Sequence, residues 1–270
     1  MGGESHQMYE SPPAPLAIET RGLTRLFDGK PAVAGIDLRV PAGAFYGFLG
    51  PNGAGKSTTM KMLTGLLRPS SGASRVLGVD LARDGLSVKG RIGVVPDGLA
   101  LFERLSGGEM LRIQGQLYGL DRKVAAGRAE ELLAAMELSA EGGKLVQDYS
   151  HGMKKKLALA CALIHGPELL FLDEPFEGID AVAVSGIRRM LQDLVVRRSL
   201  TIFLTSHVLE VVERLVTHVG IIHHGQLIAQ GSLAEVRATG SLEETFIRLV
   251  SEERPVGPGL SWLGSRADAE

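Results

Sequence analysis

The stretch from Gly50 to Thr58 has the residue types and spacing of a phosphate-binding loop, G-x-x-x-x-G-K-[ST]. Its glycines allow the backbone to approach phosphate oxygens, and the start of a following helix supplies free N–H groups and partial positive charge. Lys56 can reach the β- and γ-phosphates of a nucleotide, and Ser57 can bind Mg²⁺. The four fixed positions would match by chance in roughly 1% of chains of this length, so the loop predicts nucleotide binding. The loop consists of Gly50, Pro51, Asn52, Gly53, Ala54, Gly55, Lys56, Ser57 and Thr58.

A second stretch with residues that could take part in catalysis extends from Leu169 to Pro175, where an apolar segment ends in two acids. In a parallel sheet, the end of this segment lies beside the phosphate loop. Asp173 is then placed to hold Mg²⁺, and Glu174 to act as a general base toward the attacking water. The alternative is that the two acids merely begin a loop after a strand. The phosphate loop in the same chain favours the catalytic interpretation.

Apolar runs and turn residues predict the elements that must position these groups. Residues 44–49 form an apolar and aromatic run, which predicts a buried strand that leads into the phosphate loop. Residues 57–67 predict a helix that follows the loop and ends at Arg68 and Pro69. Short strands are predicted over 16–40, with a turn at Asp28-Gly29. Further strands are predicted over 75–79, 91–95, 169–172, 201–204, 219–223 and 226–230, and further helices over 150–164, 187–195, 207–215 and 242–250.

From Gly98 the apolar pattern changes to a helical period, which predicts a helical subdomain over about residues 98–149, inserted between two α/β halves. Residues 1–15 are polar and proline-rich and are predicted to be disordered. Residues 232–270 are predicted to form a tail that is partly helical and then disordered. The residues that carry the helical period are Met110, Ile113 and Leu117, and then Ala129, Leu132, Leu133 and Met136.

Composition limits the classes of protein that this chain can represent. The sequence has 270 residues, 44% of them hydrophobic, and a formal net charge of −2, so it has no basic footprint for nucleic acid. Its longest dense apolar run, Leu157 to Ile164, is far shorter than the roughly 18 residues of a membrane span. No secretory signal is visible at the start of the sequence, which favours a cytosolic location.

With its phosphate loop and its Leu-Asp-Glu-Pro strand, the sequence resembles the ATP-binding subunits of ABC transporters. The loop corresponds to the Walker A motif of that family, and the strand corresponds to its Walker B motif. The resemblance covers about Leu16 to Gly231, the expected ATPase domain. It implies an α/β fold, namely a P-loop NTPase core with an N-terminal antiparallel β region and an inserted helical subdomain. It also implies ATP and Mg²⁺ as ligands. The loop after the phosphate helix and the tail around 242–249 are most similar to the drug- and lipid-exporter branch.

This family also requires a signature, usually Leu-Ser-Gly-Gly-Gln, that opens a helix, and the chain offers two candidates. The Leu105–Glu109 stretch matches the letters better, but Ser106 lies 67 residues before Asp173. Ser150 lies 23 residues before Asp173, which is similar to the family spacing, and it opens directly into a predicted helix. Ser106 is instead expected to cap a helix, with Glu109 at capping-box spacing. The signature is therefore assigned to Ser150, His151, Gly152 and Met153, with His151 where the family commonly has Gly.

Four further residues receive roles from the resemblance, each with a simpler structural alternative. His207 resembles the switch histidine that contacts the γ-phosphate, although it could be an ordinary residue at a helix start. Asp180 resembles the acid of the D-loop, and it could also cap the next helix. Phe27 resembles the aromatic residue that stacks on adenine, and otherwise it would pack in a hairpin core. Asp97 stands where the family usually has Gln, and its carboxylate could bind Mg²⁺.

The resemblance implies a subunit that binds and hydrolyses ATP and forms a head-to-tail dimer. In this dimer, the signature of a second copy caps the γ-phosphate. The dimer would power export by a separate integral membrane permease. The permease would dock near Asp97 and the helical subdomain, with the chain in the cytoplasm, peripheral on the inner face of the cell membrane. Two alternatives remain: a soluble ABC ATPase acting on a non-membrane partner, and a regulatory subunit whose hydrolysis is weakened by Asp97 and His151. A P-loop GTPase or kinase is disfavoured, because the sequence has no Asn-Lys-x-Asp guanine motif.

The neighbouring His223 and His224 are residue types that could bind a metal ion. They are adjacent on a predicted strand, so their side chains are expected to face opposite ways. This arrangement disfavours a zinc site.

Overall fold

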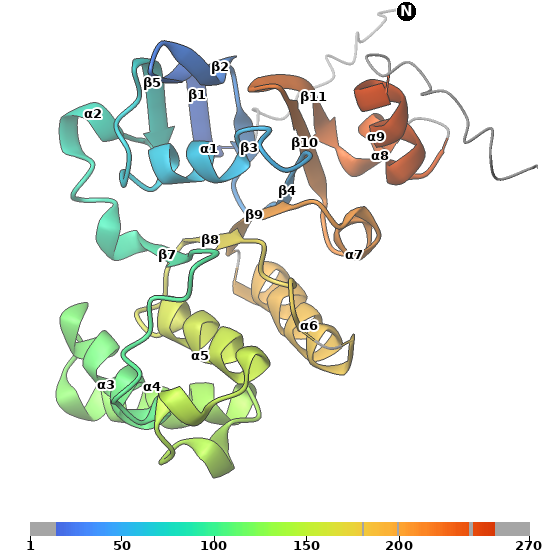
Figure 1. Ribbon diagram of the computed structural model, residues 1–270. Helices are drawn as coiled ribbons and strands as arrows, with labels where there is room; N and C mark the ends of the chain where they lie inside the picture. Colours follow the sequence, from blue (N-terminus) through green and yellow to red (C-terminus); the bar gives the residue numbers. More distant parts are fainter. Residues whose placement is uncertain (1–14, 180, 199, 238–239, 252–270) are drawn as a thin grey trace, which may run out of the picture.

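The computed structural model of the chain describes residues 15–179, 181–198, 200–237 and 240–251. The predicted disorder at the two ends falls outside these ranges, apart from Pro15, and so does Asp180. In the described part, two β-sheets lie next to each other, and a helical lobe lies at one side of the larger sheet (Figure 1). No helix in the described ranges is long and apolar enough to cross a membrane.

The larger sheet carries the two motifs that could do chemistry. Its strand order is β11-β10-β4-β9-β8-β7, and all neighbours pair in parallel except β10 and β11. Every residue of β4, β8 and β9 is buried, because both faces of the sheet are covered, and this explains the continuous apolar runs in the sequence. The strands are β4 (Phe45–Leu49), β7 (Ile92–Val95), β8 (Leu169–Asp173), β9 (Thr201–Ser206), β10 (His218–His223) and β11 (Gln226–Ser232).

The smaller sheet is antiparallel and formed by the N-terminal region. Its first two strands are joined by the predicted two-residue turn, with left-handed φ values of 49° at Asp28 and 78° at Gly29. One hydrophobic core lies between the two sheets and includes Phe48, Phe171 and Phe203 from the larger sheet. The strands are β1 (Leu16–Phe27), β2 (Lys30–Ile36), β3 (Arg39–Pro41), β5 (Ser71–Val76) and β6 (Val79–Asp80).

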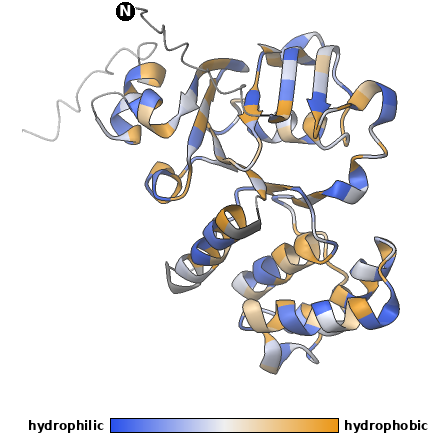
Figure 2. Cartoon of the chain, turned by 180° about the vertical axis from the view of Figure 1, so that it is seen from behind, coloured by the Kyte–Doolittle hydropathy of each residue, from blue (hydrophilic) through white to orange (hydrophobic). Residues whose placement is uncertain are grey.

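The helices fall into a lobe and a set that packs on or near the two sheets. Helices α3 and α4 pack on each other and on α5, and together they form the lobe (Figure 1). Figure 2 shows polar and apolar residues alternating around these helices, as expected for elements with one buried face. The helices are α1 (Lys56–Leu63), α2 (Leu81–Asp84), α3 (Gly107–Leu117), α4 (Arg122–Ala135), α5 (His151–Leu163), α6 (Ala181–Arg198), α7 (Leu209–Glu213), α8 (Leu233–Arg237) and α9 (Leu242–Ser251). Three 3₁₀ turns are η1 (Lys89–Arg91), η2 (Ser139–Glu141) and η3 (Val146–Asp148).

This arrangement confirms the predicted fold class of a P-loop core, an N-terminal antiparallel β region and an inserted helical subdomain. The capping box predicted at Ser106 is also confirmed. The Ser106 hydroxyl accepts from the Glu109 N–H at 3.3 Å, and the Glu109 carboxylate accepts from the Ser106 N–H at 2.9 Å. Ser106 therefore begins α3, in the lobe.

The strand predicted over 75–79 ends at Val76, because Leu77 and Gly78 form a turn with left-handed φ values. Three further local predictions were wrong. The helix after the phosphate loop ends at Leu63 rather than Leu67, because Gly65 adopts a left-handed φ of 67° and the following N–H groups fold back to Lys61. In α3, Ile113 and Leu117 are 39% and 72% exposed. The buried face instead uses Gly115, where an added Cβ would lie 3.0 Å from the Ala125 side chain.

The last of these errors concerns the histidine pair. His224 is not on the strand but in the turn after it, with a left-handed φ of 47°. The His223 and His224 rings therefore lie side by side, with centroids 4.0 Å apart, rather than on opposite faces.

Candidate functional site

The phosphate loop, Glu174, His207 and Asp97 line one cavity of about 430 Å³. The parallel register explains the gathering, because the ends of β4, β8 and β9 meet at one edge of the sheet. The residues come from the loop and from four other segments that are distant in the sequence. The cavity is lined by Ala32, Asn52, Gly53, Gly55, Lys56, Ser57, Thr58, Asp97, Glu174, Glu177 and His207.

The loop needs glycine where it passes close to neighbouring backbone. A Cβ added to Gly50 would lie 2.3 Å from the carbonyl oxygen of Ile222. At Gly55 the φ is 108°, and an added Cβ would lie 2.5 Å from the carbonyl oxygen of Ala32. The two fixed glycines of the motif therefore allow the loop to turn between β4 and α1 without a steric clash.

Lys56 is the cation at the centre of the loop. It is buried, and its ammonium donates to the carbonyl oxygens of Gly50 at 2.8 Å and Pro51 at 3.3 Å. It also lies 3.4 Å from the Glu174 carboxylate. A phosphate group in the cavity would meet this ammonium together with the N–H groups at the start of α1.

Ser57 lines the cavity, and Asp173 lies directly behind it without lining the cavity itself. The Ser57 hydroxyl donates to Asp173 Oδ1 at 3.2 Å, and the Thr205 hydroxyl donates to the same oxygen. Burial raises the pKa of Asp173, whereas the hydrogen bonds from Thr205 and Ser57 lower it. A hydroxyl, a buried carboxylate and the nearby Asp97 form a hard oxygen set that fits Mg²⁺.

No group of three or more His, Cys, Asp or Glu side chains in the described ranges is arranged to hold a metal ion.

The side chains of Glu174 and His207 both line the cavity and contact each other. His207 Nδ1 lies 3.1 Å from Glu174 Oε1. Glu174 has a left-handed φ of 46°, which is uncommon for a residue with a side chain and is often found at functional sites. Its N–H donates to the carbonyl and hydroxyl oxygens of Thr205, each at 3.2 Å. The carboxylate is thereby aimed at the space beside Lys56 and His207.

The residues assigned to the signature do not line this cavity. Ser150 is the N-cap of α5, and its hydroxyl accepts from the Met153 N–H at 3.3 Å. The His151 ring packs over Gly178, where an added Cβ would lie 3.1 Å from the ring. His151 is exposed, and Gly152 and Met153 are half-buried. The chain thus carries a second helix start suited to anions, separate from its own phosphate loop.

Phe27 and Asp97 can both be placed, whereas Asp180 cannot. Phe27 is 45% exposed at the end of β1, and the Arg25 guanidinium lies 4.6 Å from the centroid of its ring. It therefore does not pack in a hairpin core, and it does not line the cavity either. Asp97 follows β7 and lines the cavity together with Ser57.

Two residues near Glu174 were not assigned a role from the sequence. Thr205 donates to Asp173 and accepts from Glu174, and a polar residue at the end of an apolar strand was the signal for it. Lys155 is buried in α5, and its ammonium donates to the carbonyl oxygens of Glu174 at 3.0 Å and of Glu177. In the sequence, Lys155 stands at the spacing i, i+3, i+4 and i+7 with apolar residues of α5. This spacing indicates that Lys155 lies on the buried face of the helix.

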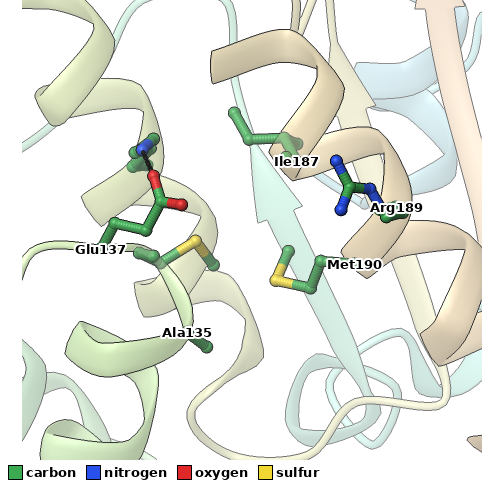
Figure 3. Close-up of a pocket in the computed structure, with 8 residues that line it drawn as sticks. Ala135, Glu137, Ile187, Arg189 and Met190 are labelled. Atoms are coloured by element: carbon green, nitrogen blue, oxygen red, sulfur yellow. Dashed lines mark hydrogen bonds and ion pairs between the residues drawn. The ribbon is translucent and has the colours of Figure 1, made fainter. Parts of the chain in front are cut away.

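A second hollow of about 210 Å³ lies between α6 and the end of α4 (Figure 3). Met190 and Ile187 of α6 face Ala135 and Glu137 across it, and Glu137 pairs with Lys156 at 2.9 Å. It contains none of the site residues predicted from the sequence.

Comparison with known proteins places this geometry among related molecules. Residues 33–177 match the family model described as "ABC transporter", a range that contains both the phosphate loop and Glu174. The bacitracin transport ATP-binding protein BcrA of Bacillus licheniformis is 39% identical over 213 residues, which cover 79% of this chain and 69% of BcrA. The daunorubicin/doxorubicin resistance ATP-binding protein DrrA of Streptomyces peucetius is 40% identical over 233 residues, which cover 86% and 70% of the two chains. A solved structure of an ATP-binding subunit of an ABC transporter superposes with a TM-score of 0.80 at 29% identity, over 87% of this chain and 99% of that one.

Proposed function

The chain belongs to the ABC transporter family of ATPases, and we propose that it hydrolyses ATP as half of a head-to-tail dimer that drives a separate membrane permease. One observation carries this proposal. The cavity holds the phosphate loop and the catalytic groups of one site, whereas the signature helix start at Ser150 lies outside it. Each chain then supplies the catalytic half of one site and the anion-binding half of another.

In this proposal the residues of the chain divide the work of hydrolysis. Lys56 and the loop N–H groups hold the β- and γ-phosphates, and Ser57, Asp173 and Asp97 hold Mg²⁺. When bound, Mg²⁺ neutralises negative charge on the phosphate oxygens. Glu174 accepts a proton from the attacking water, and His207 positions that water and contacts the γ-phosphate.

The second copy completes the site in this proposal. The N–H groups at the start of its α5, with the Ser150 hydroxyl and Gly152, meet the γ-phosphate from the side opposite Lys56. Phe27 stacks on the adenine from the open surface of β1, and Asp180 contacts the partner through the D-loop. The ranges 16–231 and 98–149 serve as the ATPase domain and its helical subdomain.

The permease and the direction of transport are inferred from the relatives. One relative is named for bacitracin transport and another for daunorubicin and doxorubicin resistance, and export of a toxic compound accounts for both names. The chain would act at the inner face of the cell membrane, with the permease docked near Asp97 and the helical subdomain. Two exposed apolar side chains, Phe102 in the segment after Asp97 and Leu117 in α3, are consistent with a covering partner there.

The variant Glu174→Gln tests the catalytic role of the cavity. We expect turnover to fall by about 100-fold or more, since a positioned general base contributes about that factor, while ATP binding persists. The variant should also accumulate as an ATP-bound dimer, measured by light scattering with and without ATP. The matched control is Glu168→Gln, at the other end of the same strand, where an exposed acid pairs with Arg91. Full turnover in Glu174→Gln would contradict the role of the base.

Purification of the chain with its partner tests the coupled step. Solubilised membranes should yield a complex with an identified protein that spans the membrane, and its presence should stimulate ATP turnover. A complex with soluble proteins alone would favour the non-membrane alternative. Absent turnover in both the free chain and the complex would favour the regulatory alternative.

A further inference from the structure

Three consecutive lysines, Lys154, Lys155 and Lys156, follow the first turn of α5, and the structure gives them different surroundings. Lys154 pairs with Glu103 at 2.8 Å and Lys156 pairs with Glu137 at 2.9 Å, in both cases with an acid that is largely exposed. Lys155 is 7% exposed and faces inward, toward the segment that follows β8. Its ammonium donates to two main-chain carbonyl oxygens in that segment, of Glu174 at 3.0 Å and of Glu177.

These bonds act on the backbone of Glu174. That residue has a left-handed φ of 46°, a conformation that persists only where surrounding contacts fix it. Thr205 fixes it from one side, by accepting the Glu174 N–H at 3.2 Å. Lys155 fixes it from the other side, by donating to the Glu174 carbonyl oxygen. The carboxylate projects from between these two anchors, toward Lys56 and His207.

Packing alone does not explain a lysine at this position. Burial lowers the pKa of Lys155, while the charges of Glu177, Asp97 and Glu174 raise it. An apolar side chain of similar length would avoid the cost of desolvating an ammonium. The ammonium of Lys155 is therefore best explained by the groups that it binds, which are the carbonyl oxygens of Glu174 and Glu177 in the turn after β8.

We propose that Lys155 is a positioning residue for ATP hydrolysis, which holds the Glu174 main chain so that the carboxylate faces the attacking water. The proposal rests on the function proposed above for Glu174. It also has a consequence for the dimer, because Lys155 lies one turn beyond the start of α5. The helix whose N-terminus meets the partner's nucleotide would thus also hold the catalytic turn of its own site.

The test is Lys155→Met, which keeps the length of the side chain and removes the ammonium. We expect kcat to fall by about tenfold or more, because misplacement of a catalytic group costs rate, with an unchanged Kd for ATP. The binding measurement also reports on folding, since a chain that binds ATP with native affinity has an intact phosphate loop. Lys154→Met and Lys156→Met are the matched controls in the same helix, and both should keep the wild-type kcat.

A double variant separates a positioning role from a general structural one. If Lys155 acts through the Glu174 carboxylate, Lys155→Met should have almost no further effect on the residual single-turnover rate of Glu174→Gln. Wild-type kcat in Lys155→Met, an equal loss in the two controls, or a further tenfold loss in the double variant would each overturn the proposal. A Glu174→Gln chain with full turnover would instead overturn the proposed function on which it rests.

Discussion

Two helix starts in this chain are suited to phosphate oxygens, and they stand in contrasting surroundings. At the start of α1, Lys56 is buried among two carbonyl oxygens and a carboxylate, and Ser57 donates to Asp173. At the start of α5, Ser150 caps the helix through Met153 and does not line the cavity that holds Glu174. The first helix start belongs to a cavity that could bind and activate a nucleotide. The second could only add N–H groups to a nucleotide that is held elsewhere.

This difference explains how one chain can carry every motif and still form incomplete sites. In the proposed dimer, the closed site has donors on both sides of the γ-phosphate, and the cavity described above would supply Lys56 and the loop N–H groups on one side. The chain places its remaining donors at α5, from which they can serve a second molecule. Under this interpretation, changes at the start of α1 act within one chain, and changes at the Ser150 end of α5 act on the partner's site.

The largest effect within this comparison is expected from Gly152→Asp. Among the residues that the structure describes, an added Cβ at this position meets only the Ile179 side chain, at 4.0 Å, and an acid in the first turn of a helix suits the helix dipole. The variant should therefore fold, while its charge repels the γ-phosphate of the partner's nucleotide. We expect turnover to fall by about 100-fold, similar to the loss of a preorganised donor to a developing charge, with the Kd for ATP of the monomer unchanged.

Gly152→Ala is the control for this change, and it should keep most of the turnover. If the Gly152→Asp chain hydrolysed ATP at the wild-type rate, this would contradict the proposal that the start of α5 completes the partner's site.

A smaller effect, on stability alone, is expected from Ser106→Ala. The Ser106 hydroxyl and Glu109 form a capping box within the lobe, so its loss should lower the free energy of unfolding by about 1 kcal/mol. Turnover per folded chain should not change. Denaturant unfolding and an ATPase assay on the same preparation would check both statements. A loss of turnover at unchanged stability would instead restore Ser106 as the signature.

The smallest effect is expected from Phe27→Ala. The ring is half exposed on β1 and does not line the cavity, so it contributes only where an adenine reaches it. Loss of one stacking contact should weaken ATP binding by about 1 kcal/mol, or roughly fivefold in Kd. Titration with a fluorescent ATP analogue would measure this. An unchanged Kd would mean that Phe27 serves only the surface contact with Arg25.

The sequence predicted the elements whose cause is local. Continuous apolar runs gave β4, β8 and β9, since a strand that is buried on both faces needs apolar residues throughout. The capping box at Ser106 and the turn at Asp28-Gly29 also follow from residues that are close in the chain. The cavity could be predicted because parallel strands bring their ends to one edge.

The features that the sequence could not predict depend on distant contacts. The left-handed backbone of Glu174 is fixed by Thr205 and Lys155, which lie 31 and 19 residues away along the chain. The buried face of α3 includes Gly115, because α4 approaches there too closely for a side chain. Neither arrangement leaves a local pattern, since the partner residues belong to other elements.

The central claim is that each nucleotide is shared between two chains, and one mixing measurement tests it directly. Lys56→Met should bind ATP weakly and Gly152→Asp should fail to complete a partner's site, so each chain alone should show almost no turnover. In a mixed dimer, the intact phosphate loop of the Gly152→Asp chain meets the intact Ser150 end of the Lys56→Met chain. An equimolar mixture should therefore regain ATP turnover that neither variant shows alone. A mixture that remains as inactive as its components would contradict the shared site.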